Sequence, residues 1–185
     1  MKKKIIIFAS GNGSNAENIT RFFQSSEVAT VHSVLCNRKE AGIFERFKPY
    51  TTPCLWFDAS SPKAMLAYCQ EHQPDLIVLA GYLKKIPEAF IARFPKKIIN
   101  IHPALLPSFG GKGMYGMHVH EAVYNAKATI SGISIHYVNK HYDEGAIIYQ
   151  AKVQLAPHDT PTDIAQKVQA LEYRHYPVII HQLLT

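Results

Sequence analysis

Short apolar runs alternate with amphipathic stretches through the first hundred residues of the chain. Five runs rich in aliphatic and β-branched residues predict buried strands: Ile5–Ala9, Val28–Asn37, Cys54–Phe57, Leu76–Ala80 and Ile98–Ile101. Helical periodicity or helix-start signals lie between them, and these predict helices over Ala16–Gln24, about Glu40–Phe47, Pro62 to about Gln70, and a short segment after Pro87. Strands of this kind that alternate with helices predict a mainly parallel sheet covered on both faces.

The pattern changes in the second half of the chain, after a predicted helix over His118–Asn125. Apolar and polar residues alternate over 133–137, which predicts a strand with one face less buried than in the earlier strands. The segment Gly145–Val153 is expected to pair with it as an antiparallel edge. A capping signature at Thr160–Asp163 starts a closing helix, and Pro177 should kink or restart that helix. The predicted fold class is therefore α/β: a single doubly wound, Rossmann-like domain over residues 1–185.

Composition narrows the class of protein. With 185 residues, 47% hydrophobic and 18% charged, the chain is long enough for one domain with a sizeable core. The net charge of +6 favours anionic partners, but the basic residues are spread along the chain rather than gathered in an arm. The charge does not single out nucleic acid, because a small phosphorylated or polycarboxylate substrate would explain it equally well, and surface solubility alone would also account for it.

The compartment is suggested by short apolar runs and few cysteines. No apolar run is long enough to span a bilayer, and the polar Ser10-Gly11-Asn12 ends the stretch behind Lys2–Lys4 too early for a signal peptide. The three cysteines are widely spaced and indicate neither a disulfide framework nor a thiolate zinc site. We expect a cytoplasmic protein without a membrane partner.

The segment Ser10–Ala16 contains two glycines and stands where a doubly wound fold places its first strand-to-helix turn. Glycine allows close backbone approach, and the following helix offers free N–H groups to a phosphate. A tight turn without a ligand is the simpler alternative. The spacing of Gly11, Gly13 and Ala16 also matches the dinucleotide fingerprint, and Arg38 in place of the usual acid would suit NADP. An NADP-dependent oxidoreductase is therefore a competing hypothesis.

Asn100, His102 and Asp143 form the second candidate site. Asn100 and His102 end an apolar run, and Asp143 lies in an acid-glycine turn between two predicted strands. In acyl transfer, an amide N–H stabilises the developing oxyanion and an imidazole moves protons, while a carboxylate raises the imidazole pKa. Ordinary turn chemistry would also place Asn and Asp at these positions.

Other reactive groups give weaker signals. His118 and His120 resemble part of a metal cluster, but residues two apart on a helix face different sides and no third ligand has recognisable spacing. We therefore predict no metal. Neither a nucleophile elbow nor a cysteine in a nucleophile context is present, so a covalent intermediate is not indicated.

Four motifs together resemble the phosphoribosylglycinamide formyltransferase family of folate-dependent enzymes. They are Gly-Asn-Gly-Ser-Asn at 11–15, Leu-Ala-Gly-Tyr at 79–82, Asn-Ile-His-Pro-Ala-Leu-Leu-Pro at 100–107 and Asp-Glu-Gly at 143–145. The resemblance continues to Glu172 and Tyr176-Pro177 and so covers nearly the whole chain. It implies transfer of the formyl group of 10-formyltetrahydrofolate, the co-substrate, to the amine of phosphoribosylglycinamide (GAR) in purine biosynthesis.

The resemblance also implies a map of the site. Asn100, His102 and Asp143 would be catalytic. The substrate GAR would be held by Gly13, Ser14, Asn15, Gln169 and Glu172. The folate would be held by Lys63, Leu83, Lys84, Lys85, Ile86, Asn139, Lys140, His141 and Tyr142. We expect small-molecule substrates, no nucleic acid and a monomer or homodimer.

Three departures from the family pattern stand out. Lys140 replaces a usual acid, and the glycine-rich segment Phe109–Met117 looks longer than the usual loop, so we predict a mobile lid with Lys112 near an anionic group. The chain ends at Thr185, directly after the last predicted helix.

Two relatives that share the Asn-x-His motif remain as alternatives. Formyltetrahydrofolate hydrolase would use the same three residues with water, and methionyl-tRNA formyltransferase is expected to be longer. A non-catalytic phosphate-binding module would leave the three residues unexplained.

Overall fold

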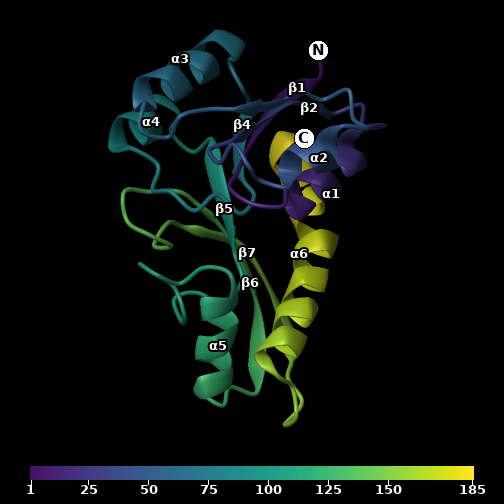
Figure 1. The fold of residues 1–185 in the computed structure, drawn as a ribbon, viewed down its shortest axis with the longest axis vertical. Helices are drawn as coiled ribbons and strands as arrows, with labels where there is room; N and C mark the ends of the chain where they lie inside the picture. Colours follow the sequence, from purple (N-terminus) through teal and green to yellow (C-terminus); the bar gives the residue numbers. More distant parts are fainter.

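The computed structural model describes residues 1–185 and contains one seven-stranded sheet in the order β3-β2-β1-β4-β5-β6-β7 (Figure 1). The strands are β1 Lys3–Ala9, β2 Ala29–Cys36, β3 Cys54–Trp56, β4 Leu76–Leu79, β5 Ile98–His102, β6 Ile130–Tyr137 and β7 Ile147–Gln154. The strands β1 to β5 pair in parallel, whereas β6 and β7 are antiparallel. The predicted fold class is thus confirmed, including its antiparallel edge.

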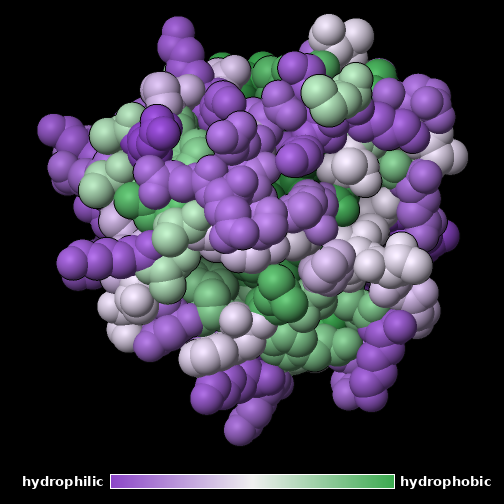
Figure 2. Space-filling view, turned by 90° about the horizontal axis from the view of Figure 1, so that it is seen from above, coloured by the Kyte–Doolittle hydropathy of each residue, from purple (hydrophilic) through white to green (hydrophobic).

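Helices cover both faces of the sheet. They are α1 Ser14–Phe23, α2 Ile43–Phe47, α3 Pro62–His72, α4 Glu88–Arg93, α5 Met117–Asn125 and α6 Pro161–Leu184. Apolar residues of α1, α2, α5 and α6 share one core cluster of 27 buried residues, and those of α3 and α4 belong to a second cluster of 11. Hydrophilic side chains cover most of the face seen in Figure 2, and hydrophobic ones gather in its lower half. None of the helices has the length and hydropathy needed to cross a membrane.

Strand β6 is more buried than the alternation of its residues predicts. Every residue from Ser131 to His136 is buried, including the polar Ser134 and His136. The expectation of a less buried face is therefore wrong. Hydrogen bonds permit this burial, because Ser134 Oγ donates to the Ala104 carbonyl at 2.7 Å and accepts from the Leu106 N–H at 2.9 Å. The same bonds fix the turn that follows β5.

Helix α6 continues without interruption through Pro177, so the predicted restart does not occur. A proline cannot donate a hydrogen bond to the carbonyl four residues earlier, which here belongs to Tyr173. The side chain of Asn18 on α1 supplies the missing donor, with Nδ2 at 2.9 Å from the Tyr173 oxygen. Next to the proline, the fully buried Tyr176 donates from its hydroxyl to the Leu79 carbonyl at 3.0 Å. These contacts hold the proline-containing turn against α1 and the sheet.

The order of the strands places the functional loops at one edge of the sheet. Parallel strands β1, β4 and β5 lie side by side. The chain runs outward from β1 through β2 to β3 and then returns, so that β4 lies on the other side of β1. In open sheets of this kind ligands bind at the carboxyl ends of the strands where the strand order reverses. The loops after β1 and β4 are joined there, since Ser10 N–H donates to the Gly81 carbonyl and Ser10 Oγ accepts from the Leu83 N–H.

Candidate active site

A cavity of about 680 Å³ opens at this edge. Its size lies within the range of small-molecule sites. The walls come from the loops after β1 and β4, the end of β5, the glycine-rich loop, the β6–β7 loop and the first half of α6. Asn100, His102 and Asp143 all line it, although Asp143 lies more than forty positions along the chain from the other two.

His102 lies at the end of β5 and is 3% exposed. Its Nδ1 lies 3.5 Å from Asp143 Oδ2, and its Nε2 lies 2.8 Å from the Phe109 carbonyl oxygen, to which it donates. Both ring nitrogens thus face acceptors, which favours the imidazolium form. Burial has the larger effect and lowers the pKa of His102 below its ordinary value, with Asp143 and the Phe109 carbonyl opposing it. The imidazole is therefore neutral at neutral pH, because burial outweighs the effect of the carboxylate that was expected to raise its pKa.

Asp143 is held in place by backbone geometry and by donors. Its φ of 55° lies in the left-handed region, and a Cβ at the nearby Gly145 would come within 1.6 Å of the Tyr137 carbonyl oxygen. This close approach explains the glycine of the acid-glycine turn. Burial acts to raise the pKa of Asp143, but His136, His102 and the Gly111 N–H (3.0 Å from Oδ2) together hold that pKa below its ordinary value. Asp143 is ionised.

His136 is a site residue that sequence reasoning missed. It lies opposite Asn100 in the β5–β6 pairing. Its Nδ1 donates to the Tyr137 carbonyl at 2.9 Å, and its Nε2 lies 3.2 Å from Asn100 Nδ2. The same Nε2 lies 3.6 Å from Asp143 Oδ1. His136 thus orients the Asn100 amide, and the sequence marked it only as a histidine at a polar position of an alternating strand.

The first glycine loop forms another part of the cavity. Gly13 has φ 73°, and a Cβ there would lie 2.3 Å from Ile43 Cγ1, so both the angle and the packing require glycine. Asn15 Nδ2 donates to Glu172 Oε2 at 2.8 Å, while Asn15 Oδ1 is buried without a partner and can accept from a ligand. Burial raises the pKa of Glu172 to about 7, although the bond from Asn15 opposes this effect.

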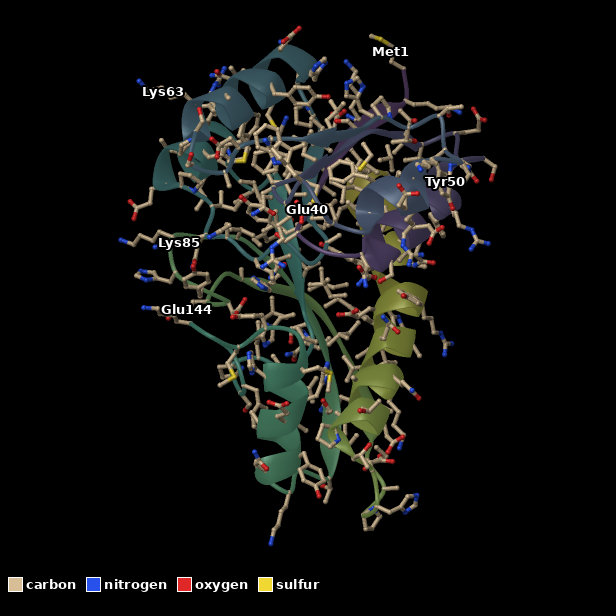
Figure 3. The ribbon with its side chains drawn as sticks, viewed as in Figure 1. Met1, Glu40, Tyr50, Lys63, Lys85 and Glu144 are labelled. Atoms are coloured by element: carbon tan, nitrogen blue, oxygen red, sulfur yellow. The ribbon has the colours of Figure 1, made fainter.

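The cavity brings together most of the predicted binding residues. From the predicted set it is lined by Asn15, Leu83, Lys84, Lys85, Ile86, Asn139, His141, Tyr142, Gln169 and Glu172. Gly13, Ser14, Lys63 and Lys140 are not among the lining residues. Lys63 projects from the exposed start of α3, above Lys85 in Figure 3. Asn12, which was not predicted, also lines the cavity.

The glycine-rich loop closes one side of the cavity. Met114, Tyr115 and Met117 line it, whereas Lys112 is exposed and does not. Of the two following histidines, His118 is exposed and paired with Glu121, while His120 is buried and faces the cavity. The two therefore face different sides of α5, as predicted. No group of three or more His, Cys, Asp or Glu side chains is arranged to hold a metal ion.

The fold and the site define the class of protein. The chain belongs to the formyl transferase family, whose model matches residues 3–180.

Particular relatives narrow this class. The chain is 39% identical to the chloroplastic phosphoribosylglycinamide formyltransferase of Arabidopsis thaliana over 97% of its own length, but it spans only 64% of that protein. It is 36% identical to the phosphoribosylglycinamide formyltransferase of Bacillus subtilis, with 98% of this chain and 95% of that protein covered. The crystal structure of the Streptococcus pneumoniae phosphoribosylglycinamide formyltransferase superposes with a TM-score of 0.88 at 34% identity and covers all of both chains.

Proposed function

We propose that the protein transfers the formyl group of 10-formyltetrahydrofolate to the amine of GAR in purine biosynthesis. The observation that carries this proposal is the meeting of Asn100, His102 and Asp143 in one cavity, which Asn12 and Asn15 of the first glycine loop also line. Relatives that bear the name of this activity and match nearly the whole chain support it. The cytoplasm is the proposed location, and the three free cysteines are consistent with a reducing compartment.

The proposed chemistry is direct transfer through a tetrahedral intermediate. The amine nitrogen of GAR attacks the formyl carbon, and negative charge develops on the formyl oxygen. The second N–H of Asn100 Nδ2, which His136 does not occupy, donates to that oxygen. One such donor typically contributes about 3 kcal/mol to lowering the barrier. Once the substrate has displaced the Phe109 carbonyl, the proton of the neutral His102 ring lies on Nδ1, facing Asp143. Nε2 then accepts the proton that the amine loses and returns it to N10 of the folate as the carbon–nitrogen bond breaks.

Asp143 stabilises the imidazolium that forms on His102 during this transfer. Its ionised carboxylate lies 3.5 Å from Nδ1 and has its own donor in the Gly111 N–H. The other nitrogen, Nε2, is engaged by the Phe109 carbonyl. The substrate therefore replaces that carbonyl when it reaches His102, which supports a glycine-rich loop that moves during turnover.

The proposed substrate positions follow the two parts of the cavity. The phosphate of GAR lies on the backbone of Gly13, Ser14 and Asn15, where the first N–H groups of α1 lack helical partners. Gln169 and Glu172 hold the rest of that substrate. The folate lies against the predicted residues of the loops after β4 and after β6, with Lys63 and Lys140 as outer contacts beyond the cavity wall.

Breakdown of 10-formyltetrahydrofolate, followed by absorbance with and without GAR, tests the proposal. Loss that requires GAR is expected. Equal loss without GAR would indicate a hydrolase that uses the same three residues. No loss in either mixture would favour the NADP-dependent oxidoreductase, with NADP bound at the first glycine loop.

A further inference from the structure

The first glycine loop, Ser10–Ala16, is held from outside the cavity by the side chain of Arg46, which the proposed chemistry does not use. Arg46, in α2, donates from Nε to the Asn12 carbonyl oxygen at 2.7 Å. The start of α2 packs closely on the same loop, because a Cβ at Gly42 would lie 2.9 Å from Asn12 Oδ1 and Ile43 contacts Gly13. The loop is thus supported from outside the cavity.

Two further residues orient Arg46. Its Nη1 pairs with Glu17 Oε2 on α1, and the Tyr50 hydroxyl donates to Glu17 Oε1 at 2.9 Å. Burial acts to raise the pKa of Glu17, but Arg46 and Tyr50 outweigh it and hold that pKa below its ordinary value. Glu17 is therefore ionised and fixes the guanidinium plane. Arg46, Glu17 and Tyr50, called the outer clamp here, connect the loop to α1 and α2.

The clamp controls the direction of one peptide group. In a planar trans peptide the carbonyl and the next N–H point in opposite directions. Since Arg46 holds the Asn12 carbonyl, the Gly13 N–H points away from Arg46. No backbone acceptor within the protein takes that N–H. It is free to donate to an anion at the N-terminus of α1.

We propose that Arg46 is a positioning residue for the phosphorylated substrate. It fixes the Asn12–Gly13 peptide so that the Gly13 N–H meets the substrate phosphate. This inference rests on the proposed function, because the phosphate is that of GAR. The positive charge of Arg46 is already matched by Glu17, so the effect comes from orientation of the loop rather than from attraction of the anion.

Steady-state kinetics of Arg46→Gln and Tyr50→Phe test the inference. We expect Arg46→Gln to raise KM for GAR about tenfold. The kcat at saturating GAR and the KM for the folate should stay within a factor of two. Tyr50→Phe leaves the loop contact in place and should raise the same KM about twofold. Arg46→Lys should recover little, because an ammonium does not reproduce the forked contact with Asn12 and Glu17.

Lys48→Gln is the matched control. Lys48 follows α2, is 69% exposed and pairs only with the exposed Glu45, so its loss should leave every parameter unchanged. An unchanged KM for GAR in Arg46→Gln would overturn the inference. So would a loss of kcat and of both substrate affinities together with a lowered Tm, because that result would mean that Arg46 only supports the fold.

Calorimetric titration with ribose 5-phosphate separates this inference from the proposed function. Binding that is weaker in Arg46→Gln and normal in Lys48→Gln would support the positioning role even if the formyl acceptor were a different phosphorylated amine. Equal binding by the wild type and Arg46→Gln would contradict it, whatever reaction the enzyme catalyses.

Discussion

His102 is the residue on which the proposed chemistry depends, and opposing effects set its charge. Burial lowers its pKa, and Asp143 raises it. Loss of the carboxylate leaves burial less opposed, so Asp143→Asn should lower the His102 pKa further and destabilise the imidazolium that forms during transfer.

We expect kcat to fall by about two orders of magnitude or more in both His102→Asn and Asp143→Asn, with both substrates still bound. Steady-state kinetics at pH 7 and ligand titrations measure this. The acid limb of the kcat profile should also lie at lower pH in Asp143→Asn than in the wild type. Near-normal turnover in either variant would contradict the proposed roles.

Glu172 makes the stability of the protein depend on pH. Its pKa is about 7 in the folded state, above the ordinary value of 4.5 for a glutamate. Between these values the folded protein retains a proton that the unfolded chain has lost, so the free energy of unfolding decreases as pH rises through this window. This loss of stability comes from ionising a buried carboxylate, and it reaches its full size above pH 7.

Glu172→Gln removes this cost and should gain stability relative to the wild type as pH rises from 4.5 to 8. We expect a gain of about 1 to 3 kcal/mol at pH 8, measured by urea unfolding at several pH values. Glu45→Gln, at an exposed carboxylate, is the control. If the difference in unfolding free energy between the wild type and Glu172→Gln did not change with pH, the folded protein would not bury an ionised Glu172 at high pH.

At the scale of elements, the junction of α1 and α6 explains how a long helix tolerates an internal proline. Asn18 provides the hydrogen bond that Pro177 cannot provide to Tyr173. Asn18→Ala leaves a partly buried carbonyl without a donor, which typically costs about 1 to 3 kcal/mol.

In the Pro177→Ala background the helix supplies its own N–H to Tyr173, so the same Asn18→Ala substitution should cost clearly less. A double-mutant cycle of unfolding free energies measures this coupling. Equal costs in the two backgrounds would mean that the Asn18 contact does not compensate for the proline.

At the scale of the whole molecule, most elements were predictable because the buried strands are short apolar runs. The polar positions were harder to interpret. Ser134 and His136 look like solvent-facing residues of an edge strand, but hydrogen bonds to the turn after β5 and to Asn100 satisfy them in the interior. Pro177 looks like a break, because its compensating donor lies more than 150 residues away on α1.

The candidate site was predictable only where a motif marked it. Asn100, His102 and Asp143 meet as expected. The Arg46 contact with Asn12 has no motif of its own, because it depends on how α2 packs against the loop. Lys63 and Lys140 came from family resemblance, and the cavity wall does not include them. Sequence patterns therefore marked the candidate reactive groups better than the residues that orient them.

The fate of the formyl carbon tests the central claim most directly. 10-Formyltetrahydrofolate labelled with ¹³C in its formyl group would be mixed with GAR and the enzyme, and the carbon followed by NMR. The proposed mechanism predicts that the label moves to a formamide on GAR as tetrahydrofolate appears in equal amount. Label found in free formate, or retained on the folate, would contradict it.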